Sequence, residues 1–324
     1  NTTGAQNTAV GRNALLTATT ASNNTAIGRD SMEATTTGSG NTAVGYDSLK
    51  ANTTADNNTA VGYDSLTANT TGTDNSAVGK DSLAANTTGN DNTALGDNAL
   101  AANTTANGNT AVGSAALVLN STGANNTVVG YLAADANTTG SSNVSVGKSA
   151  LSANTTADAN TAVGFNALAA NTTGANNVAI GKDALDSNTT ASNNTAVGVD
   201  SLQANTTGTQ NVAIGANAGK SITTGADNTI AGYNAGDAIT TANSNTAYGS
   251  ASLSTTTTGA TNTAIGAEAL QLNETGGSNV AVGYQALEEN TTADNNTAVG
   301  SLALTANTTG AGNSALGESS LDAN

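Results

Sequence analysis

The chain has 324 residues, of which 2% are aromatic and 9% charged, and it contains no Cys, His, Pro or Trp. The missing Cys and His exclude disulfides, thiol catalysis and most zinc sites. A formal charge of −16 makes the phosphate backbone of nucleic acid a poor partner, and no run of about 18 apolar residues marks a membrane span.

A repeat of 17 residues runs through the sequence. Every seventeenth residue from Asn7 to Asn313 is Asn, and the column that begins at Gly11 is Gly in all 19 repeats. A third column, beginning at Thr3, is Thr throughout. With the Asn as position 1, the repeat reads N-T-A-V-G-x-x-A/S-L-x-A-N-T-T-G/A-x-x. This period, free of insertions and deletions, indicates a unit that stacks on its own copies.

Positions 1 to 5 of each repeat, NTAVG at residues 7–11, predict a short strand. Positions 2 and 4 alternate with position 3, and Thr interchanges with isosteric Val at position 2, as in NVAIG at 177–181. We therefore expect positions 2 and 4 to point inward and position 3 to point outward. A second extended stretch is expected from position 8 to 14, with corners at the Gly of position 5 and the Gly or Ala of position 15.

The charged residues and the turn-forming residues set the fold class. Of the 30 charged residues, 28 fall at positions 6, 7, 10, 16 and 17, which we expect to face solvent. Gly and clustered Thr and Asn disfavour a helix in every repeat. We predict an all-β fold, a parallel β-solenoid (β-roll) of 19 coils with one 17-residue repeat per coil. At about 4.8 Å per coil the stack would extend roughly 90 Å.

The array is predicted to be one continuous domain over residues 1–324. The sequence opens and closes at the same repeat position, with Asn1 and Asn324 both at position 12, and it shows no capping element. Because solenoids need caps to protect their end coils, we expect a segment of a longer fibre.

Position 12 combines an N-glycosylation pattern with signs of burial. Asn-Thr-Thr begins at position 12 in most repeats, which fits the acceptor pattern. At Gly219 and Ile222 the repeat loses the Leu of position 9 and gains an Ile at position 12, and Gly236 and Ile239 repeat this exchange. The exchange conserves core volume, so we predict that position 12 points inward and that its Asn stacks on the next coil. Glycosylation of a subset, including the NNT at Asn57, stays open.

The same stacking is predicted for Asn at position 1, Gly at position 5 and Thr at position 14. The residues assigned to these structural ladders are Asn7, Asn24, Asn41, Asn58, Gly11, Gly28, Gly45, Thr54, Thr71, Asn52 and Asn69.

Carboxylates at position 7, among them Asp47, Asp64 and Asp81, form a broken acidic column. They lack the nonapeptide pattern of calcium β-rolls and are interpreted as a solvated corner. No catalytic residue, metal site or cofactor is predicted, and the chain is not expected to be an enzyme.

Position 3 is Ala in 16 of 19 repeats. An outward stripe of small apolar residues would mark an interface, because soluble proteins rarely expose long apolar stripes. The predicted subunit interface consists of Ala9, Ala26, Ala43, Ala60 and Ala77.

The phrases NTAVG, NVAIG and NVAVG resemble the head repeats of YadA-like trimeric autotransporter adhesins. The longer form NTAVGYxALxxNTTGxxN, around Tyr46 and Tyr284, resembles the repeat arrays of bacteriophage tail fibres. The resemblance implies a left-handed parallel β-roll in a homotrimer, on a cell surface or a virion, with a host receptor or glycan as partner. The period of 17 is longer than that of the adhesin heads.

The leading functional hypothesis is an extracellular structural and adhesive fibre segment with a repeated surface. One alternative is an ice-binding solenoid that uses an outward Thr column at position 13. Another is a mechanical filament assembled end to end. A polysaccharide depolymerase would need a carboxylate groove that interrupts the repeat, and the repeat is uniform.

Overall fold

The computed structural model describes residues 1–322. Within these residues the chain forms 19 strands of three residues each, all in parallel pairing, and no helix. Each strand covers positions 2 to 4 of one repeat. The strands are β1 (Thr8–Val10), β2 (Thr25–Ile27), β3 (Thr42–Val44), β4 (Thr59–Val61), β5 (Ser76–Val78), β6 (Thr93–Leu95), β7 (Thr110–Val112), β8 (Thr127–Val129), β9 (Val144–Val146), β10 (Thr161–Val163), β11 (Val178–Ile180), β12 (Thr195–Val197), β13 (Val212–Ile214), β14 (Thr229–Ala231), β15 (Thr246–Tyr248), β16 (Thr263–Ile265), β17 (Val280–Val282), β18 (Thr297–Val299) and β19 (Ser314–Leu316).

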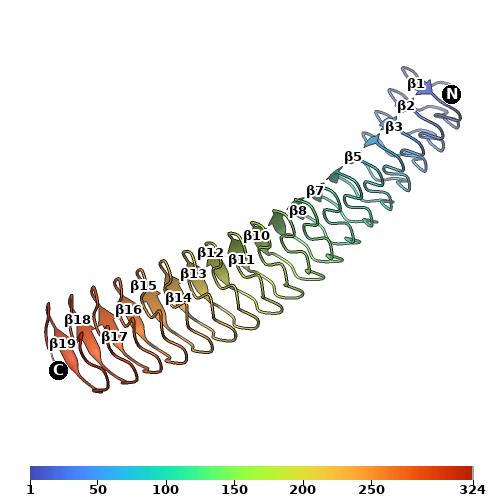
Figure 1. The fold of residues 1–324 in the computed structure, drawn as a ribbon. Helices are drawn as coiled ribbons and strands as arrows, with labels where there is room; N and C mark the ends of the chain where they lie inside the picture. The colour runs from blue at the N-terminus through green and yellow to red at the C-terminus, as the bar shows by residue number, and fades with distance from the viewer. Residues whose placement is uncertain (323–324) are drawn as a thin grey trace. The chain divides into compact units, whose positions relative to one another are not determined.

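The chain divides into two compact units, Asn1–Asn160 with β1–β9 and Thr161–Asn324 with β10–β19, the second described as far as residue 322. In each unit the coils stack one behind another (Figure 1). Neighbouring strands pair in register one repeat apart, as in Thr42↔Thr59 and Val44↔Val61. The predicted parallel β-solenoid and its 17-residue coil are thus confirmed. Residues 323–324 of the predicted array lie outside the described part.

The main chain of each coil bonds to its neighbours well beyond the strand. The Leu49 amide donates to the Ser65 carbonyl at 2.9 Å, and the Thr53 amide donates to the Thr70 carbonyl at 3.2 Å. On the remaining side, the Asn57 amide donates to the Ser39 carbonyl at 3.1 Å. The expected second extended stretch, positions 8 to 14, forms turns and bends rather than a strand. These bends are nevertheless fixed by hydrogen bonds to the adjacent coils.

Left-handed backbone conformations close each coil within 17 residues. In the coil of residues 41–57 they occur at Asp47 (φ 52°), Leu49 (φ 53°) and Asn57 (φ 60°), which occupy positions 7, 9 and 17. Asn, Asp and Gly tolerate this region and are frequent at positions 7 and 17. Leu does not favour it, so the backbone at position 9 is held by the packing of its buried side chain.

The core is narrow and half polar. In the coil of residues 41–57 the buried side chains are Asn41, Ala43, Ser48, Leu49, Asn52 and Ala55. The expected orientation of the strand was therefore wrong: position 3 points inward, whereas positions 2 and 4 are half-buried or exposed. In this coil two Ala and one Leu, rather than three branched side chains, supply the apolar packing.

The exchange of volume between positions 9 and 12 is confirmed by the packing. Ile222 is fully buried, and a Cβ atom placed on Gly219 would lie 3.1 Å from Ile222 Cδ1. In the next coil, a Cβ on Gly236 would lie 2.9 Å from Ile239 Cδ1 and 3.0 Å from Ile230 Cδ1. The Ile side chains therefore fill the space that Leu occupies in other coils.

Candidate functional site

The Asn residues at position 1 form a buried hydrogen-bonded ladder, as predicted. The Asn41 amide donates to Asn24 Oδ1 at 2.8 Å, and the Asn58 amide donates to Asn41 Oδ1 at 2.9 Å. Asn41 Nδ2 donates across the core to the Ala55 carbonyl at 2.9 Å. Through its Oδ1 each side chain thus joins its own coil to the following one, and through its Nδ2 it ties the strand to the corner at position 15. Asn7, in the first strand-bearing coil, is half-buried and makes the same type of contact.

The Asn residues at position 12 form a second ladder on the other side of the core. Asn52 and Asn69 are fully buried. Asn69 Nδ2 donates to the Gly72 carbonyl at 2.9 Å and lies 3.4 Å from Asn52 Oδ1, and Asn86 Nδ2 donates to Asn69 Oδ1 at 2.9 Å. An N-linked glycan would be attached to Nδ2, and in these residues Nδ2 is buried and hydrogen-bonded. The amides of position 12 therefore serve as structural groups in the folded chain. The NNT site at Asn57 is exposed.

The ladder at position 12 has a break in the second unit. Asn205 donates to Asn188 Oδ1, but its own Oδ1 has no hydrogen-bond partner. The next coil carries Ile222 where other coils supply an Asn Nδ2 donor. The volume exchange therefore costs one buried hydrogen bond.

Glycine is required at position 5 by contact with the next coil. At Gly45 the φ angle is 142°, and a Cβ atom would lie 2.2 Å from the Gly62 carbonyl oxygen. Gly11 and Gly28 have the same conformation and the same close approach to the following Gly. The predicted Gly ladder is therefore confirmed as a column of direct backbone contacts.

The Thr ladder was assigned to the wrong position. Thr54 and Thr71, at position 14, are exposed rather than stacked in the core. The Thr at position 13 forms the ladder instead, because Thr53 Oγ1 donates to the Thr70 carbonyl at 3.2 Å and Thr70 Oγ1 donates to the Thr87 carbonyl at 3.0 Å. The hydroxyls at position 13 are therefore engaged, which removes the column on which the ice-binding alternative was based.

The predicted Ala interface was also wrong. Ala26, Ala43, Ala60 and Ala77 are fully buried inside their own chain, so they cannot meet a second copy. Ala9 is exposed because it lies in β1, which has a paired strand on one side only. The Ala column is small because it faces the narrow core opposite the Leu of position 9.

Two coils of the sequence indicate that position 3 points into the core. Position 3 is large at Val128 and Ile230, and in the same two coils position 9 is small, at Ala134 and Gly236. Residues that exchange volume lie in one core. Conversely, position 4 accepts Tyr248, which a narrow core could not hold and which is 64% exposed.

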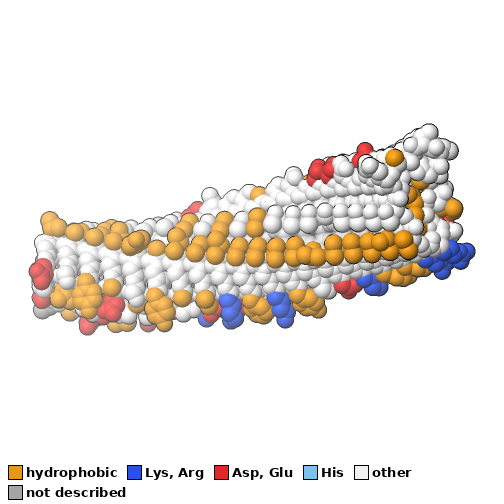
Figure 2. Space-filling view, turned by 90° about the horizontal axis from the view of Figure 1, so that it is seen from above, with side chains coloured by type: hydrophobic (Ala, Val, Ile, Leu, Met, Phe, Trp, Pro, Cys, Tyr) orange, Lys and Arg blue, Asp and Glu red, His pale blue; other side chains and the backbone are white. Residues whose placement is uncertain are grey.

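The outward side chains of positions 2 and 4, the first and third residues of each strand, form a surface that we name the strand face. Position 2 is Thr, Ser or Val in every repeat, and position 4 is Val, Ile or Leu in 17. No charged residue occurs at positions 1 to 5 of any repeat. Figure 2 shows apolar side chains gathered in rows, with the charged side chains along the margins of the view. Each solenoid unit thus carries an uncharged face with the same two ranks in every coil.

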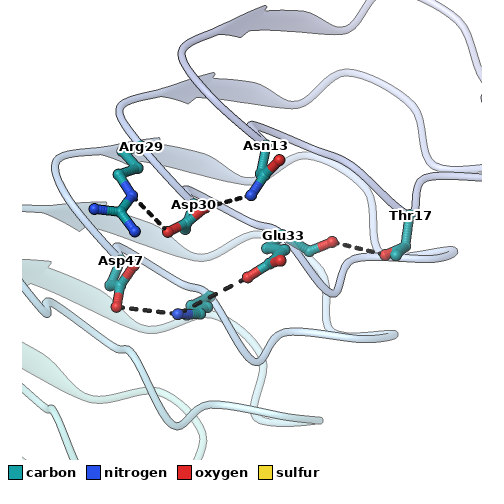
Figure 3. A network of polar contacts seen from close by, with 7 residues as sticks. Asn13, Thr17, Arg29, Asp30, Glu33 and Asp47 are labelled. Atoms are coloured by element: carbon teal, nitrogen blue, oxygen red, sulfur yellow. Dashed lines mark hydrogen bonds and ion pairs between the residues drawn. The ribbon is translucent and has the colours of Figure 1, made fainter.

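A polar and aromatic corner borders the strand face at positions 6 and 7. Arg29 lies over the ring of Tyr46 at 5.3 Å, and Tyr46 stacks on Tyr63 with ring centroids 5.1 Å apart. Beside them, Arg29 pairs with Asp30 at 3.1 Å, and Asn13 Nδ2 donates to Asp30 Oδ1 at 2.8 Å (Figure 3). The stack of Arg29, Tyr46 and Tyr63 was not predicted, although the sequence places Tyr repeatedly at position 6.

The acidic column at position 7 is electrostatically strained. Burial raises the pKa of Asp64, and the carboxylates of Asp47 and Asp81 in the adjacent coils raise it further. A hydrogen bond to Asp47 raises the pKa of Lys50, whose Nζ also lies 3.8 Å from Glu33 Oε2. The cations of Lys50 and Lys80 offset part of this repulsion, and at Asn13 and Asn98 an amide takes the place of the carboxylate.

Within residues 1–322 there is no group of three or more acidic residues placed to hold a metal ion, and no pocket. The described part of the chain also contains no helix long and apolar enough to cross a membrane. In comparisons with known proteins, no family model and no curated protein matches the chain. The extended, repeated strand face is accordingly the candidate functional site.

Proposed function

We propose that the protein is an extracellular structural and adhesive fibre segment. The observation that carries this proposal is the repetition of one uncharged strand face on coils that are bonded to their neighbours on every side. The hydrogen bonds of the main chain and of the two Asn ladders resist separation of the coils, while the strand face offers the same surface at each coil. A binding partner that recognises one coil can then be held at many.

The mechanical part of the proposal is tested by pulling the full chain in a single-molecule force experiment. We expect stepwise extension in which each step releases whole coils, roughly 60 Å of contour length per 17-residue coil at about 3.5 Å per residue. Smooth extension at low force, without steps, would contradict a load-bearing role.

The resemblance adds left-handed coiling, a homotrimer and a host receptor or glycan, which stay predictions. The buried Ala column cannot provide a trimer interface, so a trimer would need another surface, such as the exposed branched side chains of position 4. Sedimentation equilibrium tests this directly: a homotrimer has three times the 31.0 kDa mass of the chain. An open-ended mass distribution would instead favour the end-to-end filament.

A further inference from the structure

The hydroxyl groups of the strand face are free, unlike those of the other half-buried Thr column. At position 13 the hydroxyls donate to carbonyls of the next coil, as Thr53 and Thr70 do. At position 2, Thr42 and Thr59 are half-buried, and among the described residues their hydroxyls make no hydrogen bond to the protein. Each is therefore available as both a donor and an acceptor to an external partner.

The two ranks are regular in both directions. In-register pairing places Thr42 beside Thr59 and Val44 beside Val61, with strands about 4.8 Å apart. Within one strand the Thr and the Val are separated by two residues, roughly 6.7 Å. No insertion interrupts the repeat, and the rank of hydroxyls at position 2 is continuous from Thr8 to Thr127, whereas Val replaces the hydroxyl in four later coils, at Val144, Val178, Val212 and Val280.

This surface does not have the character of a site for another protein. Protein-binding hot spots are enriched in Trp, Tyr and Arg, and the strand face carries a single aromatic residue, Tyr248. Packing two strand faces together would bury ranks of hydroxyls against methyl groups, and each unpaired hydroxyl would cost free energy. The partner must therefore offer hydrogen bonds at the same regular spacing as the hydroxyls.

We infer that the strand face binds the surface of ice. The spacing between strands is close to a repeat of the oxygen lattice of ice, so the hydroxyls of successive coils can take lattice positions while the branched side chains order the water beside them. The absence of charge matters because ions hold water in orientations that the lattice excludes. The inference rests on the proposed role of the same face as the adhesive surface, and it names the partner.

The test measures the binding of the labelled full chain to ice and its effect on the growth of ice crystals. The key variant carries Thr42→Lys and Thr59→Lys in the strand face. The matched control carries Thr54→Lys and Thr71→Lys in the same two coils, at exposed Thr residues of position 14. Circular dichroism and thermal melting establish that both variants keep the fold.

We expect the wild-type chain and the control to bind ice and to slow its growth. The strand-face variant should bind ice and slow its growth roughly twofold less or weaker still, because charge interrupts the lattice match. Failure of the folded wild-type chain to bind ice would overturn the inference. So would a wild-type oligomer that the strand-face variant converts to monomer, because the face would then join copies of the chain. The pulling experiment judges the structural role independently of either result.

Discussion

Single residues set how closely the coils approach. Gly45 has no side chain, and its neighbour Gly62 presents a carbonyl oxygen where a Cβ would lie. The Asn residues at positions 1 and 12 make the opposite contribution, since they fill the core with amides that bond from coil to coil, apart from Asn205 Oδ1 and Asn296 Nδ2, which have no partner. The contacts between Gly residues and the Asn ladders together fix the distance between successive coils.

We predict that Gly45→Ala destabilises the protein by at least about 2 kcal/mol, because it combines an overpacking clash with a backbone conformation open only to Gly. The control is Gly312→Ala, at position 17 of the last described coil, where φ is 74° and no following coil lies within 4 Å of the added Cβ. Position 17 already holds Ala159 at a φ of 58°, so the control should cost only about 1 kcal/mol. Urea denaturation measures both, and equal costs would show that the contact with Gly62 is unimportant.

At the scale of one coil, the core is a partnership between positions 3 and 9. Most coils pair Ala with Leu, whereas the coil of β8 pairs Val128 with Ala134, both buried. The coil of β14 goes further and pairs Ile230 with Gly236. Each coil therefore preserves the summed volume of the side chains at positions 3 and 9 rather than the identity of either residue.

We therefore expect strong coupling between Val128 and Ala134. Val128→Ala should cost about 2 kcal/mol through a cavity, and Ala134→Leu about 1–3 kcal/mol through overpacking. The double variant restores the pairing of the neighbouring coils and should be close to the wild type. A double-mutant cycle in urea gives the coupling energy, and additive costs would show that the two side chains do not share one space.

Much of a coil could be predicted from the sequence, but the direction of its strand could not be read from alternation alone. The period, the Gly of position 5 and the burial of Asn52 followed from strict columns and from the paired change at Gly219 and Ile222. In a three-residue strand, alternation allows either face to be inside. Interchange of Thr and Val at position 2 fits an exposed β-branched site as well as a buried one. The left-handed backbone conformation of Leu at position 9 could not be predicted, because tertiary packing overrides the local preference of Leu.

At the scale of the whole molecule, acidic residues outnumber basic ones, with 23 Asp and Glu against seven Lys and Arg. Burial raises the pKa of Asp64, Asp135, Asp186, Asp237 and Glu288. In the folded state these groups therefore bind protons at a higher pH than in the unfolded chain. The net charge of −16 adds general repulsion.

The sign of the pH dependence follows from this excess of bound protons. The free energy of unfolding should rise as the pH falls through the raised pKa values, and level off near the ordinary carboxyl values of about 4. We expect a higher melting temperature at about pH 5 than at pH 7. A variant with Asp135→Asn, Asp186→Asn and Asp237→Asn should show a smaller rise. A melting temperature that falls steadily on acidification would contradict the assignment.

The in-register contact of each Gly with the Gly of the next coil has a genetic consequence. Because every coil meets its neighbours in the same way, a gene can gain or lose whole repeats by unequal recombination without changing any contact within a coil. A single inserted codon, in contrast, shifts the Gly, Asn and Leu columns together. Selection can thus adjust the number of coils freely while it holds the 17-residue unit constant.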